Sequence, residues 1–320
     1  MPPVIEIDGL TKAFDGIVAV DNIRLTVDEG EMFGVVGPDG AGKTTTMRLL
    51  CGLLTPTAGT AKILGNDLVR ESKMINREIG YMSQRVSLYG DLTVNENIEF
   101  FAEINEVYDF KRRRDELLEF TRLTPSRDRR AEQLSGGMKQ KLGLACTLIH
   151  HPRVLFLDEP TTGVDPVSRR DFWHILSSLL EERITIVMTT PYLDEAERCS
   201  RVALMHQGKV MVADEPQRLK RLMHGEVIEV ICNRIREAAS LLKERAGAAC
   251  PGLTGVQVFG DRLNLVVTES RTSFPSIERL LRNNGITVAE WRIITPSLEN
   301  VFISLVSAAS PGNATSSERQ

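Results

Sequence analysis

The residues best suited to chemistry lie in a glycine-rich stretch between a short apolar run and a helix-forming run. A strand, a glycine-rich turn and a helix in this order are the context that a phosphate-binding loop requires. Glycine lets backbone N–H groups converge on phosphate oxygens, and the start of the helix adds its positive dipole. We therefore predict a nucleoside triphosphate site formed by Gly37, Pro38, Asp39, Gly40, Ala41, Gly42, Lys43, Thr44 and Thr45.

Lys43 and Thr44 have separate tasks in this prediction. Lys43 is long enough to reach the β- and γ-phosphates, and the Thr44 hydroxyl can take a place on Mg²⁺. Asp158 and Glu159 follow an apolar run, 154–157, that is typical of a buried parallel strand. Open α/β sheets bind ligands at the carboxyl ends of their strands, so these two carboxylates are expected at the binding edge.

Short apolar runs separated by turn residues indicate the elements that position these groups. Strands are predicted over 4–7, 17–20, 23–27, 31–36, 61–64, 79–84, 184–188, 203–205 and 209–213. Gln84 ends one of them, a helical block is predicted over 93–121, and Ser135 caps the next helix. Phe14 precedes the first turn, where its ring could stack on adenine or pack in the core, and the residues leave both open.

A second, smaller domain is predicted from residue 225 to 308, after a first domain over 1–224. Its elements follow the order β-α-β-β-α-β, which is the split βαβ arrangement of a small ferredoxin-like sheet. A last helix, capped by Thr295 with Pro296 at its first position, offers one apolar face. Residues 309–320 are small and polar, and we predict that they are disordered.

The composition limits the possible classes of protein. The chain has 320 residues, of which 42% are hydrophobic and 26% charged, and a net charge of −4, which argues against nucleic acid as the main partner. It shows neither a basic start followed by an apolar run nor eighteen apolar residues together, so we expect no secretory signal and no membrane span. Five scattered cysteines without Cys-x-x-Cys spacing predict reduced thiols in a cytosolic protein.

The order of the motifs resembles that of ATP-binding-cassette (ABC) transporter ATPases over residues 4–215. The resemblance is carried by the glycine-rich loop, Gln84, Leu-Ser-Gly-Gly at 134–137, the strand ending in Asp158-Glu159-Pro160, and residues 161–166. Leu-Ser-Gly-Gly is the most specific of these, because other phosphate-loop proteins lack it. The resemblance implies an α/β P-loop NTPase cassette with a RecA-like core, an antiparallel β-subdomain and a helical subdomain, followed by the α+β ferredoxin-like domain.

The same resemblance implies roles for individual residues. Asp158, Thr44 and Gln84 are expected to hold Mg²⁺ at a bound ATP, and Glu159 is expected to act as general base, with Lys43 and Gln84 completing the catalytic set. Ser135, Gly136 and Gly137 are expected to complete the ATP site of a second cassette across a dimer interface, with Asp165 linking the two sites. ATP would then hold together a homodimer or a heterodimer.

One position departs from the ABC pattern. The pattern calls for a histidine that contacts the γ-phosphate after strand 184–188, and this sequence has Pro191 there. Proline has no N–H donor, and the five histidines lie elsewhere. Either Thr190 or a water takes over this contact, or hydrolysis is slow.

Residues 87–97 and 295–302 resemble the coupling segment and the C-terminal domain of drug-efflux ABC subunits. This resemblance implies a cytoplasmic ATP-hydrolysing subunit, bound at the inner face of the membrane to a separate integral-membrane permease. Because the last helix offers an apolar face, we expect the small C-terminal domain to steady the dimer. One alternative is a soluble ABC ATPase acting on ribosomes or DNA, although this chain has one cassette and no sustained heptads. Another, resting on Pro191, is a slowly hydrolysing nucleotide switch.

Overall fold

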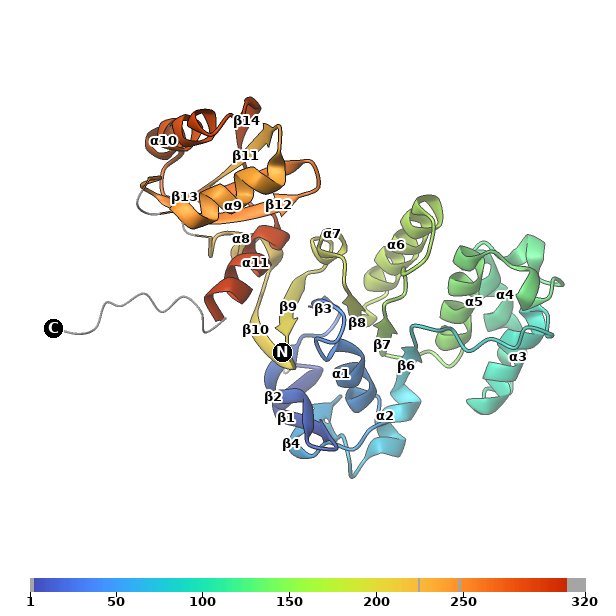
Figure 1. Ribbon diagram of the computed structural model, residues 1–320. Coiled ribbons are helices and arrows are strands. Elements are labelled where there is room, and N and C mark those ends of the chain that lie inside the picture. The colour runs from blue at the N-terminus through green and yellow to red at the C-terminus, as the bar shows by residue number, and fades with distance from the viewer. Residues whose placement is uncertain (1–2, 224, 247–248, 310–320) are drawn as a thin grey trace. The chain divides into compact units, whose positions relative to one another are not determined.

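The computed structural model describes residues 3–309 apart from 224, 247 and 248. The chain divides into two compact units, Met1–Glu215 and Pro216–Gln320, each considered by itself (Figure 1). The predicted domain boundary follows residue 224, which is not among the described residues. The predicted disordered tail also lies outside the described residues, except for Ala309, at which the last helix ends.

A six-stranded sheet in the order β10-β9-β3-β8-β7-β6 forms the middle of the first unit, and all its pairs are parallel except β9 with β10. The strands are β3 (Met32–Val36), β6 (Ile79–Met82), β7 (Val154–Asp158), β8 (Thr185–Thr190), β9 (Arg201–His206) and β10 (Lys209–Asp214). Every residue of β3, β7 and β8 is buried, as expected for parallel strands covered on both faces. Since Val36 pairs with Thr190 and Asp158 with Thr189, the ends of these three strands meet at the start of the glycine-rich loop.

An antiparallel sheet in the order β2-β1-β4-β5 forms a second layer of this unit. It consists of β1 (Ile5–Phe14), β2 (Ile17–Val27), β4 (Ala58–Ile63) and β5 (Asn66–Asp67). The strands predicted over 17–20 and 23–27 are one strand, β2. Asn22 adopts a left-handed conformation (φ 50°) inside a bulge, so the pairing with β1 continues on both sides of it.

The helices of the first unit are α1 (Lys43–Leu50), α2 (Ser72–Glu78), α3 (Val94–Ile104), α4 (Phe110–Phe120), α5 (Gly136–Leu148), α6 (Pro166–Glu181) and α7 (Leu193–Ala196), with 3₁₀ turns η1 (Thr124–Ser126) and η2 (Ala131–Gln133). The helical block predicted over 93–121 is confirmed as α3 and α4, which gather with α5 at one side of the unit (Figure 1). A capping box starts α3, because Thr93 and Glu96 each accept a hydrogen bond from the other's backbone N–H. On α6, Trp173 is buried beneath the Arg198 guanidinium, which lies 5.2 Å from the ring centre.

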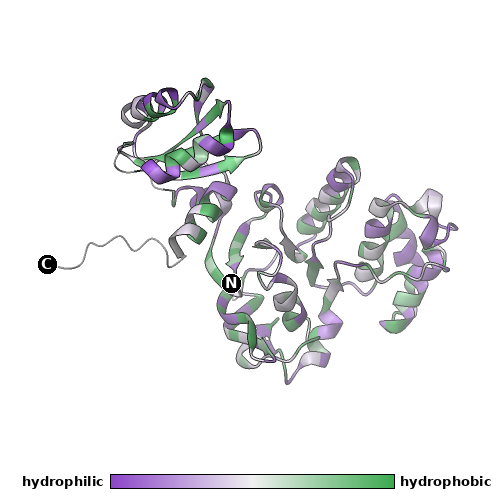
Figure 2. Cartoon of the chain, in the orientation of Figure 1, coloured by the Kyte–Doolittle hydropathy of each residue, from purple (hydrophilic) through white to green (hydrophobic). Residues whose placement is uncertain are grey.

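The second unit contains the predicted β-α-β-β-α-β order. Its elements are α8 (Pro216–Lys220), β11 (Glu226–Cys232), α9 (Ile235–Arg245), β12 (Leu253–Phe259), β13 (Arg262–Val267), α10 (Ser270–Asn283), β14 (Val288–Ile294) and α11 (Leu298–Ala309). The strand order is β12-β13-β11-β14, with every pair antiparallel, which confirms the split βαβ arrangement. The strands of this sheet are largely hydrophobic, whereas α10 carries many hydrophilic residues (Figure 2).

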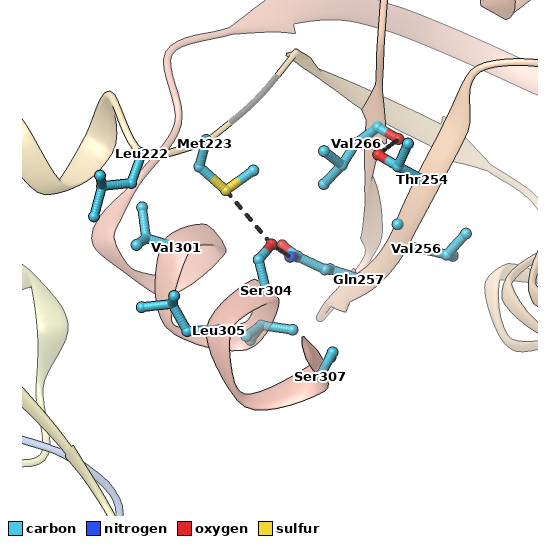
Figure 3. A pocket seen from close by; sticks show the side chains of 12 residues that line it. Leu222, Met223, Thr254, Val256, Gln257, Val266, Val301, Ser304, Leu305 and Ser307 are labelled. Carbon is cyan, nitrogen blue, oxygen red and sulfur yellow. Dashed lines mark hydrogen bonds between the residues drawn. The ribbon is translucent and has the colours of Figure 1, made fainter. Parts of the chain in front are cut away.

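The last helix is fastened to β12 by a buried polar contact. Asn300 Nδ2 donates to Gln257 Oε1 (2.6 Å), and Gln257 Nε2 donates to the Asn300 carbonyl (3.2 Å). A cavity of about 540 Å³, lined by residues of β12, β13 and α11 with Leu222 and Met223, lies beside Gln257 (Figure 3). The prediction that Thr295 and Pro296 start the helix is wrong. The helix begins at Leu298, because Ser297 Oγ accepts from Asn300 N (3.2 Å) and donates to the Asn300 side chain.

All five cysteines are unpaired and buried, and burial raises the pKa of each thiol. Within the described part of the chain, no helix has both the length and the apolar character needed to cross a bilayer.

Candidate functional site

The glycine-rich loop connects the buried strand β3 to α1. A Cβ atom at Gly37 would overlap the carbonyl oxygen of Met205, so the backbone can take this path only without a side chain there. A cavity of about 460 Å³ lies beside the loop. It is lined by residues 39–45 together with Ala19, Gln84 and Glu159. The structure thus brings the loop, Gln84 and Glu159 together, as the sequence predicts.

Lys43 and Glu159 form a buried ion pair at this cavity. The Lys43 ammonium lies 3.2 Å from Glu159 Oε1, and the two side chains are only 4% and 6% exposed. The ammonium also donates to the carbonyls of Gly37 (2.8 Å) and Pro38 (3.1 Å). Burial of both charges is tolerated because each neutralises the other and the backbone satisfies the remaining N–H groups.

Asp158 lies behind this pair and binds two hydroxyl groups. Thr44 Oγ1 (3.1 Å) and Thr189 Oγ1 (2.7 Å) both donate to its Oδ1 atom. A hydroxyl and a carboxylate are oxygen ligands of the kind that Mg²⁺ prefers. Within the described part of the chain, no cluster of three or more His, Cys, Asp or Glu side chains could hold a metal. The predicted set therefore fits Mg²⁺ bound through a few protein oxygens together with phosphate and water, and does not form a complete cage.

Glu159 is held by contacts of both its backbone and its side chain. Its backbone is left-handed (φ 48°), and its N–H donates to Thr189 Oγ1 (2.9 Å). Its Oε2 atom accepts hydrogen bonds from Gln84 Nε2 (2.8 Å) and Thr162 Oγ1 (3.3 Å). Gln84 therefore contacts the carboxylate of Glu159, the residue after the predicted metal residue Asp158. The hydrogen bond from the Gln84 amide holds the Glu159 side chain in place.

The residues predicted to serve a second cassette lie at two helix starts. Ser135 Oγ accepts from Met138 N (3.3 Å) at the start of α5, as the predicted cap. Asp165 Oδ1 accepts from the N–H groups of Val167 and Ser168 at the start of α6. Hydrogen bonds from Ser168 and Val167 lower the pKa of Asp165. Ser135 and Asp165 are exposed, and neither is among the described residues that line the cavity beside Lys43.

The starts of α5 and α6 lie against each other. Gly137 is buried, and a Cβ atom there would overlap the Ser168 side chain. Gly136 is exposed at the same place. The structure therefore brings Ser135, Gly136, Gly137 and Asp165 together at these two helix starts. Gly136 also lines a cavity of about 390 Å³ together with Gln84.

Phe14 lies at the end of β1 and is 42% exposed. The Lys12 ammonium lies 5.0 Å from its ring centre, and Ile17 and Val18 are exposed nearby in sequence. Its ring is thus outside the buried core, and contact with an adenine ring stays a prediction.

Sequence reasoning missed a buried carboxylate next to Pro191. Glu195 on α7 is 1% exposed and accepts hydrogen bonds from Thr161 Oγ1 (2.6 Å) and Thr190 Oγ1 (2.8 Å). Arg169 Nε of α6 lies 3.5 Å from the same carboxylate. The Thr190 hydroxyl therefore already donates a hydrogen bond to Glu195, and this bond would have to break before Thr190 could donate to a phosphate.

Thr189, which holds both Asp158 and Glu159, was also missed. The signal was present: Thr189 and Thr190 directly follow the apolar strand residues, at the edge where α/β sheets bind ligands.

Comparison with known proteins places these features in a wider group. Residues 20–162 match the family model of the ABC transporter. The chain is 40% identical over 310 residues to the probable multidrug ABC transporter ATP-binding protein YbhF of Escherichia coli (strain K12), covering 96% of this chain but 52% of that protein. It thus spans about half the length of that relative. The daunorubicin resistance ATP-binding protein DrrA3 of Streptomyces coeruleorubidus is 37% identical, with 94% of this chain and 95% of that protein covered.

A solved structure shows the same fold over about two thirds of the chain. The ATP-binding cassette MJ0796, solved as a dimer bound to ADP and Pi in a post-hydrolysis state, superposes with a TM-score of 0.60 at 26% identity. The match covers 66% of this chain and 98% of that one. The expected cassette fold is confirmed.

Proposed function

This chain belongs to the ATP-binding proteins of ABC transporters, and from that premise we propose that it binds and hydrolyses ATP to drive export through a separate membrane permease. The observation that carries the proposal is the joint placement of Lys43, Gln84 and Glu159 around one cavity at the glycine-rich loop. The names of the related multidrug and daunorubicin resistance proteins support export as the driven process.

The Lys43–Glu159 pair suggests how ATP binding prepares hydrolysis. The β- and γ-phosphates are stronger anions for Lys43 than one carboxylate, so they displace Glu159 from the ammonium. Glu159 then keeps its hydrogen bonds from Gln84 and Thr162 and is free to orient and deprotonate water. Thr44 and Asp158 would hold Mg²⁺, which neutralises charge on the phosphates when bound.

A complete site needs two chains in this proposal. Ser135, Gly136, Gly137 and Asp165 lie together at two helix starts, and none is among the described residues that line the cavity beside Lys43 in their own chain. The N-terminal end of α5 offers N–H groups and a positive dipole to a phosphate of another chain. The dimeric solved cassette supports this arrangement. The partner cassette is either a second copy of this chain or a related one.

The location follows from the permease partner. We place the chain in the cytoplasm at the inner face of the membrane, with residues 87–97 as the contact to the permease. The Tyr89 ring packs edge-on against the Phe100 ring, with ring centres 4.4 Å apart, and Tyr89 remains 49% exposed. Its aromatic surface is therefore available to the permease, which supports this contact.

Replacement of Glu159 by Gln tests the proposal. The variant keeps the hydrogen-bonding shape but cannot take a proton, so phosphate release is expected to fall by about 100-fold or more while ATP still binds. Size-exclusion chromatography with Mg-ATP is expected to show the variant as a trapped dimer. Glu182→Gln, on the exposed end of α6, serves as the matched control and keeps wild-type turnover. Absence of ATP binding by the wild-type chain would overturn the proposal.

A further inference from the structure

The second unit has an uncovered strand at one edge of its sheet. Among the residues that the structure describes, strand β14 pairs only with β11, and residues 289–293 are all exposed. An edge strand presents a row of unpaired N–H and C=O groups to any other strand that can approach. Trp291 is 44% exposed and Ile293 51% exposed on the same face of this strand.

At the opposite edge, strand β12 contacts another element of the same unit through one of its side chains. Strand β12 is bonded to α11 through Gln257 and Asn300, and the apolar residues Leu298 and Val301 of α11 are 0% and 2% exposed. These two residues are buried inside the unit, whereas Phe302 and Leu305 of the same helix are half-buried, so only part of the apolar face of α11 is left to contact a second chain. Of the two edge strands, β14 has the longer run of exposed residues.

The sequence of β14 is complementary to itself. Glu290 and Arg292 flank Trp291 with opposite charges. If two copies of β14 pair antiparallel about a two-fold axis through Trp291, Glu290 of one copy faces Arg292 of the other, twice. Charged side chains at an edge usually discourage association, but here the two charges have opposite signs, so each can meet its opposite on a second copy. Opposite charges two residues apart favour this one register.

The strand is also held ready for such pairing. Arg292 donates to Glu229 of β11 (2.8 Å), and the Trp291 ring stacks on Phe274 of α10 with centres 4.2 Å apart. The side chains beside the edge are thus fixed before a partner arrives, which lowers the ordering cost of association.

We propose that β14 is a self-association surface, through which the second units of two chains join into one continuous eight-stranded antiparallel sheet. The occupant of the edge is a second copy of this chain. Association of this kind needs no nucleotide, and it goes beyond the ATP-dependent pairing of cassettes proposed above.

Cysteine cross-linking of the full chain without nucleotide tests the register. Residues opposite each other in an antiparallel pair have Cα atoms about 4.5–5.5 Å apart, within the range that a disulfide spans. Trp291→Cys is therefore expected to form a covalent dimer under mild oxidation. Val258→Cys, on the other edge strand and also 44% exposed, is the matched control and stays monomeric. The natural cysteines are buried and add little background.

A mixing experiment fixes the register further. Glu290 faces Arg292 of the partner in the proposed pairing, and both lie in the part of β14 whose register with β11 is regular. Glu290→Cys chains mixed with Arg292→Cys chains are therefore expected to cross-link, whereas each variant alone is not. Glu290→Arg places arginine opposite arginine and is expected to raise the dimer dissociation constant at least tenfold in sedimentation equilibrium. Equal cross-linking of Trp291→Cys and Val258→Cys, or none in any variant, overturns the proposal. Because no nucleotide is present, that failure leaves the ATPase proposal to its own Glu159→Gln test.

Discussion

Two groups of residues in the first unit, both assigned to nucleotide chemistry, are held in opposite ways. Around Lys43, Asp158 and Glu159, charged side chains are buried and bonded to one another across α1, β7 and β8. Ser135 and Asp165 are exposed and bond within their own helix starts. Substitutions in the first group should therefore change stability and activity together. Those in the second should affect activity far more than folding.

The largest expected effect is that of Lys43→Met. It removes the partner of the buried Glu159 carboxylate, so the free energy of unfolding is expected to fall by about 3 kcal/mol, and ATP binding is lost. Denaturant titration and nucleotide-binding measurements check the two effects. The double variant Lys43→Met/Glu159→Gln, in which neither partner of the ion pair keeps its charge, should recover most of the stability. If it is no more stable than Lys43→Met, the ion pair does not organise this half of the site.

Pro191→His tests whether the site around Lys43, Asp158 and Glu159 lacks a donor to the γ-phosphate. The histidine would supply the donor that the ABC pattern places there, and one hydrogen bond to a charged group corresponds to about a tenfold rise in the rate of phosphate release. Pro191→Ala separates this gain from the simple removal of proline. An unchanged rate would mean that another group already contacts the γ-phosphate.

Ser135→Ala tests the exposed group. Loss of the hydroxyl that accepts from Met138 N costs about 1 kcal/mol of unfolding free energy, as for other helix caps. ATP-dependent dimerisation of the Glu159→Gln background should nevertheless be abolished, as measured by light scattering. Ser135→Thr keeps a hydroxyl and is the control. Dimerisation at wild-type strength in the alanine variant would contradict the two-chain site.

The smallest expected effect is a pH dependence of stability caused by His150, which lies two residues after the end of α5. Burial lowers the pKa of His150, although the hydrogen bond to the Ile79 carbonyl (2.8 Å) opposes this. A histidine kept neutral in the folded state costs stability when the unfolded chain takes up a proton. Unfolding free energy should therefore decline as pH falls below about 6.5. His150→Gln keeps an N–H donor without titrating and should flatten this decline, while a decline of unchanged steepness would contradict it.

Features set by neighbouring residues could be predicted from the sequence. The cap at Ser135, the strand ending in Asp158 and the β-α-β-β-α-β order depend on patterns within a few residues, and each is confirmed. The start of α11 was predicted wrongly for a local reason. Thr295-Pro296 is a good cap signal, but the bond between Ser297 and Asn300 two residues later provides the cap instead.

Contacts between distant residues could not be predicted. Glu195 meets Thr161 and Arg169 only because α6, α7 and the segment after β7 come together in the folded chain. A buried carboxylate has no sequence signature, since most glutamates are exposed. The charge alternation in β14 was legible in the sequence, but its meaning depends on β14 being an edge strand, which the topology decides.

The two tryptophans described above give the molecule a built-in optical label in each unit. Trp173 is the chain's buried indole and Trp291 its partly exposed one, and the sequence contains no third. Emission from the first should lie at shorter wavelength and resist acrylamide quenching, while emission from the second should be red-shifted and readily quenched. Unfolding of the two units can thus be followed separately by intrinsic fluorescence, with Trp173→Phe and Trp291→Phe to isolate each signal. Burial of Trp291 by a second β14 would register as a concentration-dependent blue shift.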